Sequence, residues 1–158
     1  MKVFLVRHAK AASGEGLRDF DRPLSLRGYN DAHKMGSFLQ PYVKGKIIIV
    51  SSPAIRALTT ALIFADELHA PKGDIVLNET LYREDAEEWY TTISLYDHEN
   101  LFIFGHNPVF SMVVSKMAEK GYEDFPTCTV ALFSEVRTGP PVTGKLTGLF
   151  SPKMFDRR

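Results

Sequence analysis

Short, continuous runs of apolar residues recur along the chain and predict buried β-strands. The clearest runs lie at 3–6 (VFLV), 47–50 (IIIV) and 101–104 (LFIF). Runs of this kind, without polar residues in alternate positions, are typical of strands that are covered on both faces. Weaker strand patterns occur at 75–77, 130–136 and 145–150, and the turn-rich stretch 138–141 (TGPP) separates the last two.

The segments between these runs carry apolar residues at helical spacing. Helices are therefore predicted over about 25–42 and 85–96, another that follows Ser52 and carries apolar residues at 55–68, and another that follows Asn107. Gly28 and Gly36 weaken the first of these helices, because glycine is a poor helix former. The residues expected to face the core are, in chain order, Leu26, Tyr29, Ala32, Met35, Leu39, Ile55, Leu58, Leu62, Ala65, Leu68, Ala86, Trp89, Ile93, Tyr96, Phe110, Val113, Val114 and Met117.

The alternation of strands and helices defines the expected architecture. Strand and helix signals follow one another from residue 3 to about residue 117, and two strand patterns close the chain. This order predicts an α/β fold, a three-layer α/β/α sandwich with a mostly parallel mixed sheet, in which the last strand or two run antiparallel. A length of 158 residues, without repeats, linkers or low-complexity segments, favours a single domain over residues 1–158.

Composition narrows the class of protein further. Lys plus Arg and Asp plus Glu both number 19, so no net charge recruits nucleic acid or an anionic membrane. No apolar run approaches the length of a membrane span, and residues 3–6 are too few for the core of a signal peptide. The single cysteine, Cys128, excludes an intramolecular disulfide, favours a reducing compartment and is expected to be a small core residue. We therefore expect a cytoplasmic protein without membrane or nucleic-acid partners.

Candidate chemistry gathers where three of the predicted strands end. Arg7 and His8 follow the first strand directly. The next two buried strands end in Ser51-Ser52-Pro53 and His106-Asn107-Pro108, so each places Ser or Asn at an expected helix N-cap and Pro at the first helical position. Arg56 falls in the first turn of one of these helices. Because ligand sites in open α/β sheets lie at the carboxyl ends of the strands, we expect these residues to converge.

The residue types at these strand ends indicate an anion site. A pocket formed by Arg7, His8, Arg56 and His106 would hold two guanidiniums and two imidazoles, and no carboxylate is expected between them. Such a pocket suits a dianionic phosphoryl group, which arginine binds through paired hydrogen bonds. Taken singly, Arg56 could be a solvated helix charge and His106 a capping residue. Paired histidines could also hold zinc, but the other histidines lack the spacing of a metal motif, so no metal is expected.

These residues also belong to motifs that match a known family. Leu5-Val6-Arg7-His8-Ala9 resembles the Arg-His-Gly signature of the histidine phosphatase superfamily, which has the phosphoglycerate-mutase-like fold. Ala9 stands in place of the glycine, a variation common in the small SixA-type phosphohistidine phosphatases. The remaining motifs resemble that subgroup in the same order, and the match spans Val3 to about Ser111. They are Asp21-Arg22-Pro23-Leu24-Ser25 with Arg27-Gly28, Ser51-Ser52-Pro53 with Arg56-Ala57 and Thr60-Ala61, and Gly105-His106-Asn107-Pro108.

The resemblance implies roles for the residues at the strand ends. His8 is the expected nucleophile, and Arg7, Arg56 and His106 are expected to bind the phosphoryl group, without a metal or other cofactor. Attack by a neutral imidazole would give a phosphohistidine that water then hydrolyses. The neighbouring arginines are expected to lower the pKa of His8, which keeps it neutral at pH 7, and to stabilise the transition state.

Further candidates for the site follow less directly from these motifs. Larger relatives use a carboxylic acid to protonate the leaving group, and Glu84 is the candidate proton donor here. The alternative, which we favour, is that Glu84 or Asp85 caps the helix that follows. Asp21 and Arg22, in the long first loop, are expected at the rim of the pocket, and Asn107 is expected among the substrate-binding residues.

The expected function is that of a metal-independent phosphatase that acts through a covalent phosphohistidine, on a phosphorylated substrate that is itself a phosphohistidine protein. A phosphoramidate needs less acid assistance than a sugar alkoxide, and the chain lacks the long insertions that cover the pocket in larger relatives. One alternative is a phosphomonoesterase for sugar or nucleotide phosphates, favoured if Glu84 is essential. The other is a phosphate-binding interaction module that has lost turnover. The presence of all four residues that the chemistry needs argues against this alternative.

Overall fold

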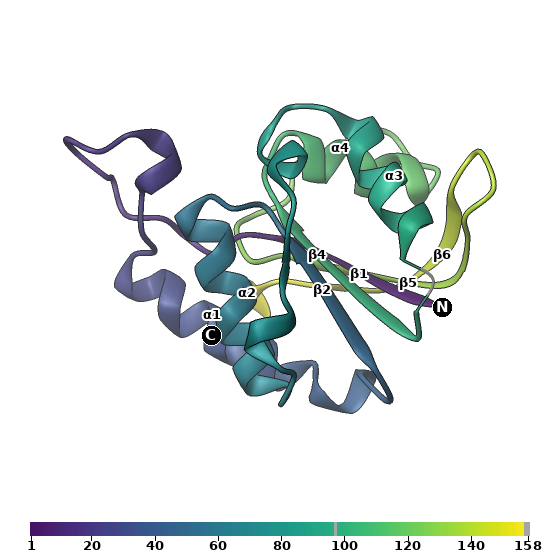
Figure 1. Cartoon of the computed structure of the whole chain (residues 1–158), viewed down its shortest axis with the longest axis horizontal. Helices are drawn as coiled ribbons and strands as arrows, with labels where there is room; N and C mark the ends of the chain where they lie inside the picture. The colour runs from purple at the N-terminus through teal and green to yellow at the C-terminus, as the bar shows by residue number, and fades with distance from the viewer. Residues whose placement is uncertain (97, 157–158) are drawn as a thin grey trace.

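The strands are arranged in the sheet in an order that differs from their order in the chain. The strands are β1 (Lys2–Arg7), β2 (Ile47–Ser51), β3 (Val76–Leu77), β4 (Asn100–Gly105), β5 (Val130–Arg137) and β6 (Thr143–Phe150). The computed structural model describes residues 1–96 and 98–156, and within them one sheet runs in the order β3-β2-β4-β1-β5-β6 (Figure 1). The first four strands of the chain pair in parallel, whereas β5 runs antiparallel to β1, and β6 antiparallel to β5.

Helices cover both faces of this sheet. They are α1 (Leu26–Phe38), α2 (Ile55–Glu67), α3 (Ala86–Leu95) and α4 (Val109–Met117). Figure 1 shows α1 and α2 below the sheet and α3 and α4 above it. The predicted α/β/α sandwich with a mostly parallel mixed sheet is confirmed. None of the helices in the described part of the chain is both long and apolar enough to cross a membrane.

The central strands are apolar along their whole length because both of their faces are covered. In β1, Phe4 and Val6 pack in the core under α1 and α2, whereas Val3 and Leu5 pack in the core under α3 and α4. Successive side chains of a strand point to opposite faces, so one uninterrupted apolar run supplies both cores. Cys128 is buried in the core next to α1 and α2, as predicted.

The inner face of α1 is only partly the predicted one. Ala32, Met35 and Leu39 are fully buried as expected. The prediction is wrong for Leu26 and Tyr29, which keep 79% and 41% of their surface accessible. Their places on the inner face are taken by glycines, which the pattern of apolar residues does not count.

The two glycines of α1 lie where the helix approaches its neighbours most closely. A Cβ added at Gly28 would overlap the carbonyl oxygen of Lys10, and one added at Gly36 would lie 3.0 Å from the Cβ of Glu67. The residues that weaken the helix by propensity therefore allow it to pack against the segment after β1 and against α2.

The predicted inner face of α2 is also wrong in part. Ile55 is exposed, and Leu58 and Leu62 are only half-buried. Because α2 packs against both the sheet and α1, its buried face is wider than a single apolar stripe, and small side chains let it approach both neighbours. The buried residues of α2 are Arg56, Ala57, Thr60, Ala61, Ile63, Phe64 and Ala65.

The junction before α2 differs from the predicted one. The helix begins at Ile55, with Ala54 as its N-cap, so Pro53 is not the first helical residue. Ser52 Oγ accepts a hydrogen bond from the Ala54 N–H at 3.2 Å. The serine thus shapes the turn that leads into the helix, and the helix itself starts two residues later than expected.

The junction before α4 is displaced by one residue in the same direction. The helix begins at Val109 with Pro108 as its N-cap. Asn107 nevertheless supplies a cap, because its Oδ1 accepts a hydrogen bond from the Ser111 N–H at 3.1 Å.

The helix predicted over about 25–42 ends earlier than expected. Its last residue is Phe38, and the residues around Pro41 form a separate 3-10 turn instead.

Candidate active site

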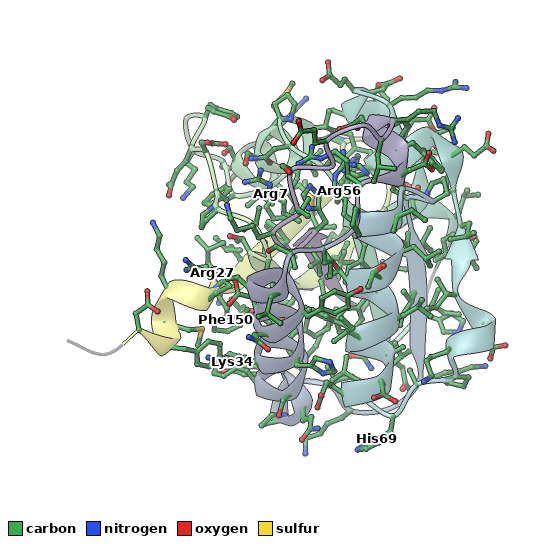
Figure 2. The ribbon with its side chains drawn as sticks, turned by 90° about the vertical axis from the view of Figure 1, so that its left-hand side faces the viewer. Arg7, Arg27, Lys34, Arg56, His69 and Phe150 are labelled. Atoms are coloured by element: carbon green, nitrogen blue, oxygen red, sulfur yellow. The ribbon has the colours of Figure 1, made fainter. Side chains whose placement is uncertain are left out.

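The first and fourth strands end side by side, so the residues that follow them meet. Arg7 pairs with Gly105 in the parallel register of β1 and β4, which puts His8 next to His106. The centroids of the two imidazole rings are 5.1 Å apart. Arg56 reaches the same place from the first turn of α2, and Figure 2 shows Arg7 and Arg56 close together at the upper end of the molecule.

These residues line a cavity of about 300 Å³ at the carboxyl ends of the parallel strands. The structure therefore brings together Arg7, His8, Arg56 and His106, the residues that the strand ends predict. The other lining residues are Lys10, Ala11, Arg22, Asn107 and Thr127. Since Lys10 and Arg22 add two more cations, the cavity is suited to a group with more than one negative charge.

The hydrogen bonds of His8 assign its tautomer. Its Nδ1 lies 2.7 Å from the carbonyl oxygen of Ala9, and a carbonyl only accepts, so Nδ1 carries the hydrogen and Nε2 keeps its lone pair. Burial, together with the charges of Arg56 and Arg7, lowers the pKa of His8 to about 4. At pH 7 the ring is therefore neutral, with a free lone pair on Nε2.

His106 is held by Ser52 and is also neutral. Its Nε2 lies 2.8 Å from Ser52 Oγ, and the ring of Tyr82 meets it edge-on with the centroids 5.5 Å apart. Burial, followed by the proximity of His8 and of Arg56, lowers the pKa of His106 to about 3. An uncharged imidazole at this position donates or accepts hydrogen bonds without adding to the charge of the cavity.

Two buried nitrogens of the site have unused hydrogen-bonding capacity. Among the described residues, neither His106 Nδ1 nor Arg7 Nε has a hydrogen-bond partner, although Arg7 Nη1 donates to the carbonyl oxygen of Phe125 at 2.7 Å. Buried polar atoms in folded proteins nearly always have a partner. The residues that line the cavity thus retain donors and acceptors for a ligand.

A carboxylate lies in the site, which corrects the expectation that there is none. Arg56 donates to the backbone oxygen of Asp19 from Nη1 at 2.7 Å and to its Oδ2 from Nη2 at 2.9 Å. The Tyr82 hydroxyl donates to the same Oδ2 at 2.8 Å, and Arg22 Nη1 donates to Oδ1 at 3.2 Å. The hydrogen bond from Tyr82 and the hydrogen bond and charge of Arg56 lower the pKa of Asp19 to about 2, so Asp19 is ionised.

Only the folded chain distinguishes Asp19 from its neighbours in the first loop. It belongs to a single 3-10 turn, Asp19–Asp21, which packs against α2. In the sequence, Asp19 and Asp21 are equivalent acidic residues of a polar loop, and both are three residues from an arginine. The spacing of Asp19 and Arg22 is the one signal available, and it is equally typical of a solvated surface pair.

Arg22 and Asn107, two of the predicted binding residues, line the cavity that holds His8. Arg22 is fixed by hydrogen bonds from Nε and Nη2 to the carbonyl oxygen of Ala12, at 3.2 and 3.0 Å. Asn107 Nδ2 donates to Asp124 Oδ1 at 2.7 Å, while its Oδ1 accepts from Ser111. The amide of Asn107 therefore connects the end of β4 to α4 and to the segment around Asp124.

The other acidic candidates do not line the cavity that holds His8. Asp21 is not among the residues that line either site cavity, and its carboxylate pairs with Arg18 at 2.8 Å. Asp85 caps α3, because its Oδ1 accepts a hydrogen bond from the Glu87 N–H at 3.0 Å. Glu84 is exposed and lines a second cavity beside the first.

This second cavity has a volume of about 330 Å³ and shares Arg56, His106 and Asn107 with the first. Its remaining lining residues are Asp19, Tyr82, Arg83, Glu84 and Val109. A larger hollow of about 690 Å³ lies between α3, α4 and the turn after β5, and it contains none of the predicted site residues. The two smaller cavities therefore form the candidate active site.

The histidines outside the site do not assemble into a metal centre. Within residues 1–96 and 98–156, no group of three or more His, Cys, Asp or Glu side chains is arranged to hold a metal ion. His33 Nδ1 lies 2.8 Å from Glu67 Oε2 on the helical layer, and Figure 2 shows His69 at the end of the molecule opposite Arg7 and Arg56.

Comparison with known proteins shows the family to which the chain belongs. The model of the histidine phosphatase superfamily (branch 1) matches residues 3–91, which is more than half of the chain. The chain therefore belongs to the histidine phosphatase superfamily.

Solved structures of similar fold cover nearly the whole chain. The structure of the protein histidine phosphatase SixA complexed with tungstate matches with a TM-score of 0.84 and 23% identity, over 99% of this chain and 100% of that one. The mycobacterial glucosyl-3-phosphoglycerate phosphatase complexed with VO3 matches with a TM-score of 0.70 and 12% identity, over 93% of this chain and 97% of that one. At these identities the likeness shows the fold.

A relative is also found by sequence. An uncharacterized protein of Mycobacterium tuberculosis (strain H37Rv) is 28% identical over an alignment of length 145 that covers 80% of this chain and 85% of that protein.

Proposed function

We propose that the protein is a phosphatase that transfers a phosphoryl group first to His8 and then to water. The observation that carries the proposal is the state of His8. Its ring is neutral, its proton is fixed on Nδ1 by the carbonyl of Ala9, and it lines a cavity that is rich in arginine. A nucleophile and a binding site for the phosphoryl oxygens thus lie together.

In the first step, His8 Nε2 attacks phosphorus and the leaving group departs from the opposite side. Arg7, Arg22 and Arg56 balance the charge on the phosphoryl oxygens as the bond to the leaving group breaks. The two bonds from Arg56 to Asp19 use two of the five N–H groups of its guanidinium, which leaves three for the phosphoryl oxygens.

In the second step, water attacks the phosphoryl group on His8 and the imidazole leaves. The phosphorylated ring carries a positive charge, because Nε2 is bonded to phosphorus while Nδ1 keeps its hydrogen. The carbonyl of Ala9 stabilises that charge by accepting the Nδ1–H bond. When the bond to phosphorus breaks, Nε2 recovers its lone pair and His8 returns to its starting tautomer.

The substrate that we propose is a phosphohistidine side chain of another protein. A phosphoramidate needs little help from a general acid, and Glu84, the candidate acid, is exposed, whereas burial is what usually keeps a catalytic carboxyl group protonated. The likeness in fold to the protein histidine phosphatase SixA supports the same substrate.

A second candidate function is hydrolysis of a small phosphomonoester. Glu84 lines the cavity next to His106, from which a carboxyl group could protonate an alkoxide. The likeness in fold to a glucosyl-3-phosphoglycerate phosphatase supports this alternative. It differs from the first in one requirement, since an alkoxide needs the acid and an imidazole does not.

The test is release of phosphate from a phosphohistidine protein and from an alkyl phosphate, with a chelator present. For wild type we expect turnover of the phosphohistidine protein and a phosphoryl group trapped on His8. For His8→Ala we expect a loss of about three orders of magnitude or more, because no other side chain replaces the nucleophile. Wild-type enzyme that binds phosphate but turns over neither substrate would refute the proposal in favour of a binding module.

Glu84→Gln separates the two substrate classes. We expect this variant to keep its activity on phosphohistidine to within about threefold, because the leaving imidazole needs no proton from Glu84. If wild type prefers the alkyl phosphate and Glu84→Gln loses that activity, the phosphomonoesterase is the correct function.

A further inference from the structure

The second cavity differs from the first in the charges that line it. The first is lined by basic side chains and histidines, whereas the second adds two carboxylates, Asp19 and Glu84, and the ring and hydroxyl of Tyr82. Both cavities are lined by Arg56 and His106. When a phosphoryl group is bound in the first cavity, its leaving group can therefore lie in the second. A leaving group there meets hydrogen-bond acceptors and an aromatic ring.

Asp19 is an acceptor that is bonded directly to Arg56, a residue that lines both cavities. Its carboxylate is bonded to Arg56, to Arg22 and to the Tyr82 hydroxyl, and these three bonds leave about one acceptor position of the four that a carboxylate offers. The side chain is 53% exposed, so a ligand can reach it. Three protein donors hold the carboxylate in one orientation in the second cavity.

Tyr82 makes the wall of this position aromatic. Its ring meets His106 edge-on, and it meets Phe20 in the same manner with the centroids 5.2 Å apart. A flat aromatic leaving group fits against such a wall better than a polyhydroxylated one. The combination of a flat wall and a fixed anion is suited to an imidazole ring with an N–H group.

We propose that Asp19 determines the specificity of the enzyme by accepting a hydrogen bond from the unphosphorylated ring nitrogen of a phosphohistidine substrate. The inference rests on the proposed function and names the residue that recognises its leaving group. Asp19 attracts the protonated, positively charged form of the phosphorylated ring and holds that ring in the second cavity.

The hydrogen bond to Asp19 makes the leaving group neutral. As His8 Nε2 bonds to phosphorus, the bond from phosphorus to the substrate nitrogen breaks, and its electron pair goes to that nitrogen. The other ring nitrogen keeps its hydrogen on the side of Asp19. The ring therefore leaves as uncharged imidazole, and no proton has to come from the enzyme or from solvent.

An aryl phosphate provides the opposite case. It leaves as an anion without an N–H group, so Asp19 has nothing to accept and its charge repels the departing oxygen. Substituting Asp19 is therefore expected to have different effects on the two substrates. A purely structural role of Asp19, in which it only holds Arg56, would affect both substrates alike.

The experiment compares kcat/KM for phosphohistidine and for 4-nitrophenyl phosphate in wild type and in Asp19→Asn. The amide keeps an oxygen for Arg56 and removes the charge. We expect the ratio of phosphohistidine to aryl phosphate activity to fall about tenfold or more. The upper limb of the pH profile on phosphohistidine is also expected to move to lower pH, because the substrate ring loses its proton more readily without the carboxylate.

Asp21→Asn is the matched control, since it removes the same charge two residues away, where the carboxylate pairs with Arg18 outside both cavities. Its activity ratio is expected to equal that of wild type. Equal losses on both substrates in Asp19→Asn, or a ratio that responds to Glu84→Gln instead, would overturn the role of Asp19 alone. Wild type that does not hydrolyse phosphohistidine, or that does so without His8, would overturn the proposed function and with it this inference.

Discussion

Burial sets the protonation of both imidazoles in the site. For His8 and His106 alike, removal from water is the largest cause of the lowered pKa, and the charges of the arginines add to it. A positive ring beside Arg56 would lose both hydration and a favourable charge environment. The cavity thus favours neutral imidazoles before any substrate enters.

This state of the histidines can be observed directly. The ring NMR signals of His8 and His106 should show no titration between about pH 5 and 8, whereas those of the urea-unfolded chain should titrate near pH 6.5. His8→Gln and His106→Gln assign the signals. A midpoint near 6.5 for His8 in the folded protein would contradict the proposed neutral nucleophile.

At the scale of single residues, neither residue type nor local spacing distinguishes Asp19 from Asp21. Both are acidic, both lie in one turn, and each has an arginine three positions away. What distinguishes them is that Asp19 contacts Arg56, which lies 37 positions further along the chain. Contacts of such long range depend on how the loop packs, and no local pattern encodes them.

At the scale of elements, close packing explains where the predicted helix faces fail. The expected faces of α1 and α2 count large apolar residues, but these helices meet their neighbours through Gly28, Gly36, Ala57 and Ala61. Glycine and alanine make a helix face less hydrophobic than large apolar residues do, but they let the helix pack more closely against its neighbours. The long apolar side chains at the edge, such as Leu26, remain exposed.

The packing of α1 leads to a stability prediction for Gly28→Ala. The added methyl group would overlap the carbonyl oxygen of Lys10, which also accepts hydrogen bonds from Ser25 at the start of the helix. We expect the free energy of unfolding to fall by about 1–3 kcal/mol, since this backbone contact outweighs the gain in helix propensity. Urea denaturation followed by circular dichroism measures it.

Gly73→Ala is the control for this substitution, because an added Cβ at Gly73 meets no atom within 4 Å. Its free energy of unfolding should stay within about 0.5 kcal/mol of wild type. Equal stability of Gly28→Ala and Gly73→Ala would show that α1 does not approach Lys10 as closely as the structure has it.

At the scale of the whole molecule, the buried histidines make the stability depend on pH. In the unfolded chain a histidine binds a proton below about pH 6.5. In the folded protein His8 does so only below about pH 4 and His106 only below about pH 3. Between these values the unfolded state binds more protons, so stability is complete above pH 6.5 and is lost as the pH falls.

We therefore expect the free energy of unfolding to decrease between pH 6.5 and 4, with His8 alone contributing on the order of 3 kcal/mol. Urea denaturation at several pH values measures the slope. His8→Gln should be less sensitive to pH over this interval, because glutamine does not titrate. The pKa of Asp19, lowered to about 2, contributes only below about pH 4 and so does not interfere. An equal slope in His8→Gln would contradict the lowered pKa.

The sequence by itself determined the layers of the fold and the four residues at the strand ends. Continuous apolar runs specify strands that are covered on both faces, and helical periodicity between them specifies the covering helices. Once parallel strands such as β1 and β4 are neighbours, whatever follows them must meet at one edge. Arg7, His8, Arg56 and His106 could therefore be predicted to converge before their distances were known.

Only the tertiary structure decided the finer properties of the site. It placed Asp19 between Arg56 and Tyr82, fixed the tautomer of His8 through Ala9, and separated a basic cavity from one that also carries carboxylates. The tertiary structure also decided that α1 and α2 contact their neighbours through small residues. These properties depend on contacts between distant segments and on burial, which arise only when the chain has folded.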